Sequence, residues 1–526
     1  MRITDDEFQL AWKRTKRAVD RSFINPFELR LIDSSGAGWL AELKAQTEIE
    51  QYTPSSPYAI DVPKQNGAIR LGSALSIEDA HIYTFLVSKN IQLIERSLRW
   101  SANKLVFSHV IKENLDEEWI ENYSQSWVKF GVESARVLEE GHNFVLFTDI
   151  TAFYENINIQ LLISDLTDIG IEKESLRYFS KCLNKWSYNG CDGLPQGYIS
   201  SDILSNLYLN NVDHQLADLG FKFFRYGDDY RFFCKTYRDA RTIQMELTRI
   251  LRSRALNLQN EKTEILKPKA ALEKIDGVRP FIEIVKSKIL DEVTVSQLES
   301  ESEYSNSYWS VWAEEDVSIA IHTVDNGFVA ETFDAHFVDT TEEDLPKFKT
   351  LFRFCLNELG RLGSTHAVNQ SLVFLRKYPE ETRYILKYLS RVGITELVAS
   401  SLLEYLSSDE SIYYFQKYLI LEWVFKQDTS IVRKYLQISK ILAYDANSPQ
   451  YLKGTCYLII GKTGNPADLE RLRTSYRDDL SESEKVKLIL ALTRMEKSKR
   501  NRFYGQIRVT SFIIGSAIRE AKQLNL

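Results

Sequence analysis

The sequence predicts two fold classes in one chain, α+β up to about residue 285 and all-α from about residue 346. Three apolar runs, at 144–150, 222–226 and 230–234, have the length of buried strands and lie among helical stretches. Beyond residue 346, amphipathic segments rich in leucine and tyrosine recur at intervals of roughly 30–40 residues. That recurrence is typical of stacked helical repeats of the HEAT kind, with an irregular helical bundle as the alternative.

The composition is that of a globular protein with several domains. The chain of 526 residues is too long for a single hydrophobic core, so two to four domains are expected. Its apolar fraction of 44% and charged fraction of 26% are ordinary. The formal net charge of −7 is unlike that of a typical nucleic-acid binder, but a binder whose basic residues line only a cleft is compatible with it.

Cysteine usage and the apolar pattern predict a cytoplasmic protein. The cysteines lie far apart and form no Cys-x-x-Cys pair, so neither a disulfide framework nor a zinc site is expected; they are Cys182, Cys191, Cys234, Cys355 and Cys456. The first residues lack the apolar stretch of a signal peptide. No apolar run approaches the length of about 18 residues that a membrane span needs.

Residues 1–115 are expected to form an N-terminal helical extension followed by a strand hairpin. The helix predicted over 7–21 carries cations that either form a solvated face or bind phosphate: Lys13, Arg14, Lys16, Arg17 and Arg21. A break at 52–57 follows. The segment 60–70 then has the pattern of a strand, an Asn-Gly turn and a second strand.

Residues 116–285 are expected to form the mixed α/β region. Helices are predicted over 158–186, with a break near Gly170, and from the segment 193–197 to Leu216. The runs 222–226 and 230–234 flank Gly227-Asp228-Asp229 and predict a hairpin with two carboxylates at its tip, because such residues tolerate the backbone of tight turns.

The rest of the chain is divided into an acidic, irregular connector over 286–345 and the helical-repeat region over 346–526. Near the end, the segment 497–508 interleaves cations with aromatic rings. This mixture either binds single-stranded nucleic acid, where bases stack on rings, or belongs to a solvated terminal helix.

Three aspartates are placed to bind metal ions. Phosphodiester synthesis uses two divalent cations about 3.5–4 Å apart, and hard cations prefer carboxylate oxygens. Asp149 ends an apolar strand, and Asp228 and Asp229 lie at the hairpin tip. Strand ends can hold carboxylates in the fixed geometry that a metal pair requires.

Five segments, in order, resemble those of reverse transcriptases. They are the fingers segment 63–70; palm motif A at 147–157; motif B at 193–197 (Gly-Leu-Pro-Gln-Gly), with Ser201, Ser205 and Asn206 after it; motif C at 225–232, with its Tyr-x-Asp-Asp box; and motif D at 260–264. The resemblance covers about residues 55–270. It implies an α+β right-hand polymerase, with fingers and palm of reverse-transcriptase type, followed by the all-α helical-repeat domain.

The resemblance implies roles for the matching residues. Asp149 and Asp228 bind Mg²⁺ or Mn²⁺ with help from the Ile150 carbonyl, and Asp229, unless it is only a turn residue, lies beside the primer terminus. Lys64 and Arg70 bind the triphosphate. Gln196 and Gly197 shape the pocket for base and template. Lys262 either protonates the departing pyrophosphate or is an exposed lysine.

Tyr154 lies five residues after Asp149, where the family places the side chain that selects the sugar. A ring there collides with a ribose 2′-hydroxyl, so the resemblance implies deoxynucleotide (dNTP) substrates and DNA synthesis. The sequence departs from the family at Asp202, where many reverse transcriptases have proline, and at Ala152, where an acidic or polar residue is common.

A palm followed by helical repeats resembles the bacterial abortive-infection and defence-associated reverse transcriptases. That group implies antiphage defence, protein-primed or untemplated DNA synthesis, single-stranded DNA attached to the protein, and trimers or hexamers. Some members use a non-coding RNA. Candidate primer tyrosines in the helical region are Tyr413, Tyr414, Tyr418, Tyr435, Tyr444 and Tyr451. The alternatives are a reverse transcriptase copying a dedicated RNA and a catalytically silent RNA-binding scaffold.

Overall fold

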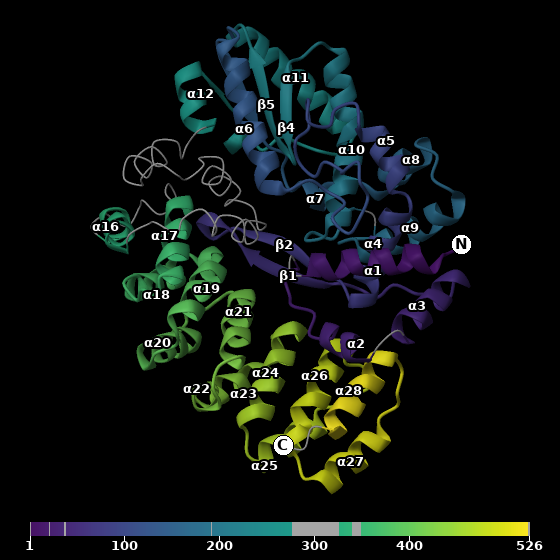
Figure 1. Cartoon of the computed structure of the whole chain (residues 1–526), viewed down its shortest axis with the longest axis vertical. Coiled ribbons are helices and arrows are strands. Elements are labelled where there is room, and N and C mark those ends of the chain that lie inside the picture. The colour runs from purple at the N-terminus through teal and green to yellow at the C-terminus, as the bar shows by residue number, and fades with distance from the viewer. Residues whose placement is uncertain are drawn as a thin grey trace. The chain divides into compact units, whose positions relative to one another are not determined.

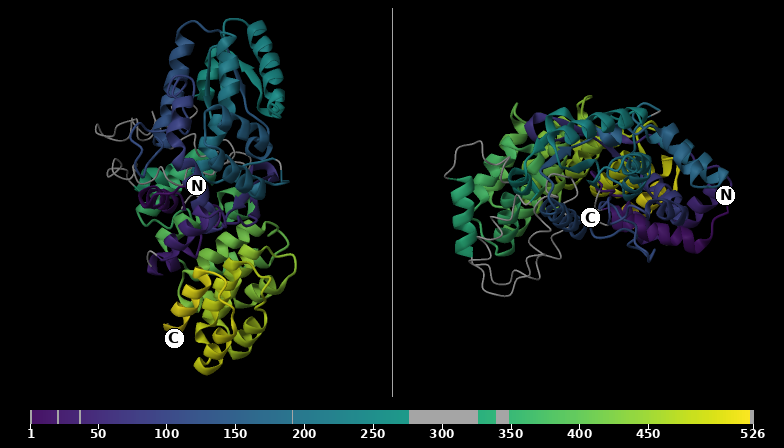
Figure 2. Two further views of the ribbon diagram at one scale, coloured as in Figure 1. Left: turned by 90° about the vertical axis from the view of Figure 1, so that its right-hand side faces the viewer. Right: turned by 90° about the horizontal axis from the view of Figure 1, so that it is seen from above.

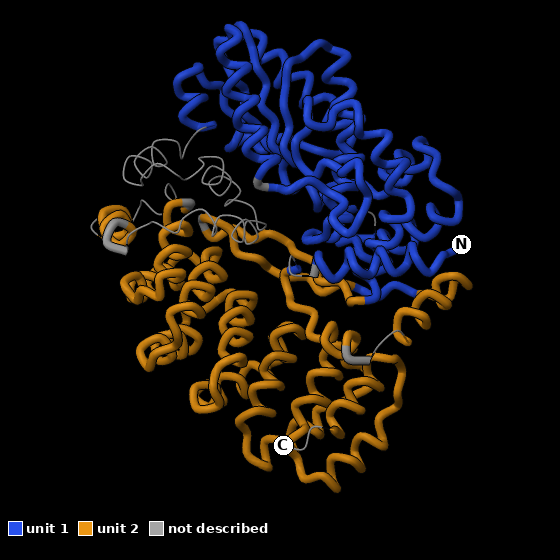
Figure 3. The backbone as a smooth tube through the Cα atoms, in the orientation of Figure 1, with its two compact units in different colours: residues 1–22, 53–56, 78–324 blue, residues 23–52, 57–77, 325–526 orange. Residues whose placement is uncertain are grey.

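The computed structural model describes residues 2–19, 22–35, 38–190, 192–275, 326–338 and 349–523. The chain divides into two compact units, each assembled from three stretches (Figure 3). Unit 1 contains residues 1–22, 53–56 and 78–324, and unit 2 contains residues 23–52, 57–77 and 325–526. The predicted connector, 286–345, lies outside the described residues except for 326–338.

Unit 1 is built around an antiparallel sheet of four strands in the order β4-β5-β3-β6. Two of these strands, β4 and β5, are labelled in Figure 1. The strands are β3 (Phe144–Thr148), β4 (Phe223–Tyr226), β5 (Asp229–Cys234) and β6 (Glu264–Leu266). The first three confirm the strands predicted from apolar runs. Their residues are almost all buried, as continuous apolar runs require.

Helices cover both faces of this sheet. α6 (Tyr123–Glu139) and α12 (Pro268–Ile275) pack on one face. α10 (Ile199–Asp218) and α11 (Tyr237–Ser253) pack on the other. Neighbouring residues of a strand point to opposite faces of the sheet. In β4, Phe224 therefore packs among hydrophobic side chains beside α6, whereas Arg225 on the other face donates hydrogen bonds to Asp213 of α10. Both faces are therefore core.

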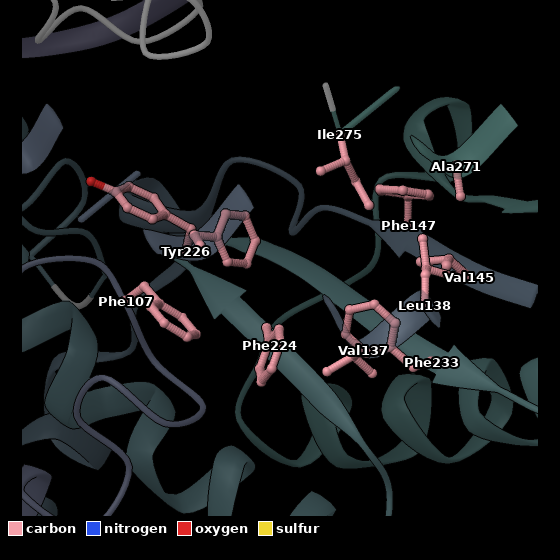
Figure 4. Packing of buried hydrophobic residues seen from close by; sticks show 11 residues of the cluster. Phe107, Val137, Leu138, Val145, Phe147, Phe224, Tyr226, Phe233, Ala271 and Ile275 are labelled. Carbon is pink, nitrogen blue, oxygen red and sulfur yellow. The ribbon is translucent and has the colours of Figure 1, made fainter. Parts of the chain in front are cut away.

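The core beside α6 and α12 is rich in aromatic rings (Figure 4). Phe147 of β3 and Phe224 of β4 are 6% and 2% exposed. Burying such a side chain contributes about 2–3 kcal/mol, so this layer holds the sheet firmly. The cluster consists of Phe107, Phe130, Val137, Leu138, Val145, Phe147, Phe224, Tyr226, Phe233, Ala271 and Ile275.

The helices of unit 1 end at local sequence signals. The helical segment predicted over 158–186 is confirmed, with its break at Gly170, whose φ is +88°. α11 begins at a capping box formed by Thr236 and Asp239. α10, 20 residues long, is buried on all sides from Ile199 to Asn210 and exposes a polar stripe only in its last two turns. The remaining helices are α1 (Asp5–Val19), α4 (Ile77–Lys89), α5 (Ile91–Leu98), α7 (Phe153–Asn156), α8 (Ile159–Asp168) and α9 (Lys173–Trp186).

Three cations of α1 have partners inside unit 1. Arg14 is 2% exposed and donates hydrogen bonds of 2.7–2.9 Å to backbone carbonyls of the segment 115–118. Lys13 and Arg17 form ion pairs with glutamates of the same segment. These contacts give the phosphate-binding alternative no support at these three positions, and Arg21 lies outside the described residues.

In unit 2, β1 (Tyr58–Pro63) and β2 (Ile69–Ala74) form the predicted hairpin. The prediction of a tight Asn-Gly turn between them is wrong, because a longer loop of residues 64–68 joins the strands. A hydrogen bond of 2.7 Å from Lys64 N to Ala68 O closes this loop. β1 packs against α21 (Tyr414–Phe425), and the Tyr413 hydroxyl donates to the Gly67 carbonyl at 3.4 Å. The hairpin is therefore held by the helical region.

Within the described residues, the rest of unit 2 is mainly helical, as the sequence predicts. α17, α19, α21, α24, α26 and α28 each contact the next in that row. The helices at the end of this row, yellow in Figure 2, are seen most clearly at the bottom of its left-hand view. The bounds are α2 (Leu29–Ser35), α3 (Gly38–Glu48), α16 (Asn326–Phe337), α17 (Lys349–Arg361), α18 (Val368–Lys377), α19 (Thr382–Val392), α20 (Glu396–Ser407), α22 (Thr429–Lys434), α23 (Leu436–Tyr444), α24 (Gln450–Thr463), α25 (Pro466–Thr474), α26 (Glu482–Ala491), α27 (Lys497–Gln506) and α28 (Phe512–Gln523).

The aromatic residues of α27 belong to the core of unit 2. Phe503 and Tyr504 are 8% and 2% exposed, and the Tyr504 hydroxyl donates to the Ile489 carbonyl at 2.7 Å. Arg500, 2% exposed, bonds the Thr493 carbonyl. These rings are not available to stack on bases, so the nucleic-acid alternative for 497–508 loses its aromatic component.

Across the described ranges, no helix is both long and apolar enough to cross a membrane. Four of the five cysteines are described, and all four are buried free thiols: Cys182, Cys234, Cys355 and Cys456.

Candidate active site

Three carboxylates meet at one end of the sheet of unit 1. β3 and β5 are antiparallel, and Thr148 lies opposite Tyr230, so the next position in the register sets Asp149 beside Asp229. β4 and β5 pair up to Tyr226 and Asp229, which leaves Gly227 and Asp228 as the turn. Antiparallel pairing thus brings together acids that are far apart in sequence.

Gly227 gives the turn its shape. Its φ is +60°, and Asp228 is not among the residues with positive φ. A two-residue hairpin turn with glycine in the first central position is of type II′, which matches the twist of the strands. A Cβ on Gly227 would meet no atom within 4 Å, so the backbone conformation, not space, requires glycine here.

The three acids repel one another strongly. Burial, then the charges of Asp149 and Asp229, raise the pKa of Asp228 well above its ordinary value. Desolvation by the surrounding protein, then the charge of Asp149, raises the pKa of Asp229 to about 6, although this side chain reaches solvent. Asp149 is 7% exposed, and its Oδ1 accepts a hydrogen bond of 3.1 Å from Ile150 N. Such a cluster is suited to a cation.

Lys262 supplies a positive charge to this cluster. Its ammonium group bonds Asp149 Oδ2. The Lys262 side chain is largely exposed. Desolvation by nearby protein lowers its pKa, but the charge and hydrogen bond of Asp149, together with the charges of Asp229 and Asp228, raise the pKa overall. The segment around Lys262 is tied to β3 through a hydrogen bond of 2.8 Å from Gln259 N to the Asp149 carbonyl. The structure therefore brings Lys262 to Asp149, as a role beside the acids requires.

Arg225, one strand position from the acids, was not predicted as a site residue. It is 1% exposed and donates to both carboxylate oxygens of Asp213 and, at 2.9 Å, to the Gly227 carbonyl. Gly227 N in turn donates to Ser108 Oγ at 2.7 Å. Arg225 thus connects the turn to α10. The sequence signal was a charged residue within an otherwise apolar strand.

The segment resembling motif B lies against α7. Gly193 N and Leu194 N donate to the carbonyls of Ile157 and Tyr154, both at 2.9 Å. Gly193 and Gly197 have φ of +96° and +110°, and a Cβ on Gly193 would lie 3.2 Å from a backbone carbonyl. Gln196 is 7% exposed.

Tyr154 is half-buried on α7, and its hydroxyl donates to Asp202 Oδ1 at 2.7 Å. Burial, then the charge of Asp202, raises the pKa of Tyr154 well above its ordinary value, and the charge of Asp228 adds to the shift. The predicted role of Tyr154 in selecting the sugar stays a prediction.

Lys64 and Arg70 lie in unit 2: Lys64 is the first residue of the β1–β2 loop, and Arg70 lies in β2 opposite Val62. The Lys64 side chain is exposed and that of Arg70 is half-buried. Their predicted binding of a triphosphate stays a prediction.

The donor set at the three acids fits a hard divalent cation. Asp149 and Asp228 offer carboxylate oxygens whose mutual repulsion a cation would relieve, and the Ile150 carbonyl follows directly in the chain. Within the described residues, no three side chains of His, Cys, Asp or Glu are arranged to hold a metal ion by themselves. The predicted ligand set, two carboxylates and a carbonyl, is of a different kind.

Residues 62–275 match the family described as "Reverse transcriptase (RNA-dependent DNA polymerase)". No curated protein matches the chain. Among solved structures, telomerase from Candida albicans in complex with a fragment of telomeric RNA is 11% identical, with a TM-score of 0.31, over 74% of this chain and 67% of that chain. Apo telomerase from Candida tropicalis is 10% identical, with a TM-score of 0.32, over 73% of each chain.

Proposed function

Residues 62–275 form a reverse transcriptase (RNA-dependent DNA polymerase) domain, and on this premise we propose that the protein polymerises dNTPs and acts in antiphage defence. The gathering of Asp149, Asp228 and Asp229 at one sheet end carries the catalytic part of the proposal. The defence role is supported by the resemblance of a palm followed by helical repeats to the abortive-infection group. Trimers or hexamers are proposed on the same ground.

In the proposed reaction, Asp149, Asp228 and the Ile150 carbonyl hold Mg²⁺ or Mn²⁺. Such cations, when bound, would supply two effects: a lower pKa of the primer hydroxyl and neutralisation of charge on the pyrophosphate. Asp229 lies beside the primer terminus. Lys262, whose pKa is raised by Asp149 against the effect of burial, stays protonated and can donate a proton to the departing pyrophosphate.

Substrate selection is assigned to four other residues. Gln196 and Gly197 shape the pocket around base and template. Gln196 is buried. Gly197 has a positive φ and no side chain, which allows the nucleotide to approach the backbone closely. Lys64 and Arg70 bind the triphosphate, because charge-assisted hydrogen bonds to phosphate are strong. Tyr154 excludes the ribose 2′-hydroxyl.

The catalytic test is incubation of the purified protein with Mg²⁺ and labelled dNTPs. The wild-type protein should make DNA, and the D228A/D229A variant should make none. D218N, at an exposed aspartate at the end of α10, is the matched control and should keep full activity. In cells, D228A/D229A should abolish protection against phage. Full protection by this variant would support the scaffold alternative.

Priming by the protein is tested on the same product. Protease treatment should shift the mobility of DNA that is attached to the polypeptide. Tyr418, Tyr435 and Tyr451 are 5% exposed or less, which leaves Tyr413, Tyr414 and Tyr444 as the half-buried candidates. Y413F, Y414F or Y444F should abolish attachment, while Y435F, at a buried tyrosine, should not.

The family description favours a second candidate, templated copying of a dedicated non-coding RNA. Sequencing of the DNA product distinguishes templated copying from untemplated synthesis. A defined sequence complementary to a co-purifying RNA supports templated synthesis, whereas a random or homopolymeric product supports untemplated synthesis.

A further inference from the structure

We propose that Asp202 is a positioning residue that fixes the Tyr154 ring and thereby strengthens discrimination against ribonucleotides. The inference rests on the proposed function, in which Tyr154 excludes the ribose 2′-hydroxyl. It adds a residue that the reverse-transcriptase resemblance does not supply, because many members of that family have proline at this position. Proline offers no side-chain acceptor for a tyrosine hydroxyl.

The far end of the Tyr154 ring is anchored. Its hydroxyl donates to Asp202 Oδ1 at 2.7 Å, and Asp202 is fully buried. Burial, then the charge of Asp202, raises the pKa of Tyr154 well above its ordinary value, so the hydroxyl stays protonated as a donor. A buried carboxyl oxygen is costly without a donor, which makes this bond persistent.

The near end of the ring is anchored through the backbone. α7 is a single turn that begins after Ala152, whose φ is +45°. The Tyr154 carbonyl accepts from Leu194 N at 2.9 Å, and the following Ile157 carbonyl accepts from Gly193 N. Because these bonds hold the Tyr154 backbone, the ring can move only by rotation about its side-chain bonds. The hydrogen bond from the Tyr154 hydroxyl to Asp202 prevents that rotation.

Asp202 is itself held in place. It lies in the first turn of α10, where its N–H donates to the Tyr198 carbonyl at 3.1 Å and the helix dipole favours a carboxylate. Its second oxygen, Oδ2, lies 3.5 Å from His109 Nε2, and His109 is also buried. The anchor is therefore part of the packed interior.

Two consequences follow for substrate selection. A ring fixed at both ends cannot swing aside to admit a 2′-hydroxyl, so exclusion is stronger than with a ring free to rotate. The Tyr154 hydroxyl is also committed to Asp202, so what Tyr154 offers a nucleotide is ring surface, not a hydrogen bond.

The test compares incorporation of dNTPs and rNTPs by purified D202A, D202N, Y154F and Y154F/D202A. D202A and Y154F should each lower the preference for dNTPs by about tenfold, the effect expected from losing one hydrogen bond to a buried carboxyl group. The change should come mainly from a lower KM for rNTPs. D202N keeps an acceptor oxygen and should restore most of the preference.

The double variant is the most direct measurement. If the two residues act through one bond, Y154F/D202A should lose no more preference than either single variant. Additive losses, or an unchanged preference in both single variants, would overturn the proposal. Y208F is the matched control: its buried hydroxyl donates to the Arg254 carbonyl at 2.5 Å, so it should lower thermal stability without changing the preference.

Failure of the proposed function has a different signature. A wild-type protein that incorporates no dNTP would contradict DNA synthesis itself. DNA synthesis with equal preference in wild type, D202A and Y154F would leave that function standing and remove Asp202 from substrate selection. Calorimetric binding of non-hydrolysable dNTP and rNTP analogues, measured on the same variants, provides the comparison without turnover.

Discussion

Arg225 and Asp213 form a buried ion pair that connects the catalytic hairpin to α10. Arg225 Nε lies 3.0 Å from Asp213 Oδ1, and Nη2 lies 2.6 Å from Oδ2. Both side chains are almost completely buried. Since Arg225 also donates to the Gly227 carbonyl, the pair fixes the turn that carries Asp228.

Removing one partner of this pair should destabilise unit 1. D213A leaves the Arg225 guanidinium buried without its counter-charge, which costs about 3–5 kcal/mol of the free energy of unfolding. The R225M/D213L double variant, which removes both charges, should be less destabilised than D213A. Urea unfolding measures both. R249A breaks an exposed pair with Glu246 and should cost less than about 1 kcal/mol. Equal urea-unfolding midpoints for D213A and R249A would contradict a structural role for the Arg225–Asp213 pair.

Removing a charge from the acid cluster should stabilise the metal-free protein while abolishing synthesis. In wild type, burial and the charges of Asp149 and Asp229 disfavour ionised Asp228, so D228N should raise the free energy of unfolding by about 1 kcal/mol near pH 8. Mg²⁺ at ten times its Kd should stabilise wild type by about 1.4 kcal/mol and D228N much less. Thermal unfolding with EDTA or Mg²⁺ checks this. Equal stabilisation of both proteins would exclude Asp228 as a ligand.

His81 should make the stability of unit 1 fall as the pH is lowered. It is fully buried beside Phe8 and Trp12, and burial lowers its pKa to about 3. The unfolded state binds a proton with a pKa of about 6.5, so the stabilising effect is complete above that pH and is lost as the pH falls toward 3. From pH 7 to pH 5 the loss should be about 2 kcal/mol in urea unfolding. H81L should flatten this part of the profile, whereas H366Q, at an exposed histidine, should not.

Two glycine-to-alanine changes should have opposite effects. A Cβ on Gly461 of α24 would lie 2.4 Å from the Ala491 carbonyl oxygen, so G461A should separate α24 from α26 and cost about 3 kcal/mol. A Cβ on Gly131 of α6 would meet nothing within 4 Å, so G131A should stabilise its helix by about 0.5–1 kcal/mol. Melting temperatures should therefore shift in opposite directions. A stabilising G461A would mean that α24 and α26 do not pack this closely.

The sheet and the acid cluster of unit 1 could be predicted because their signals are local. Apolar runs mark β3, β4 and β5, and Gly227-Asp228 marks the turn between two of them. Once the strands pair, the register alone sets Asp149 beside Asp229.

Other features depend on partners that the sequence does not specify. Nothing in the sequence near Arg225 indicates that Asp213 faces it, and Asp202 stands out in the sequence only as a departure from the family pattern. The helical stretch from Thr429 to Tyr444 is divided into α22 and α23 at Tyr435, whose hydroxyl donates to the carbonyl of Ala399 in α20. In each case, a contact in the folded protein decides the outcome.

The interleaving of the two units has a consequence for how the protein is made. The β1–β2 hairpin belongs to unit 2 and packs on α21, which is synthesised long afterwards. At translation rates of about 5–20 residues per second, its strands leave the ribosome on the order of tens of seconds before their helical support exists. During that interval their backbone edges and apolar face are open to mispairing, so newly made chains should depend on chaperones until α21 has emerged.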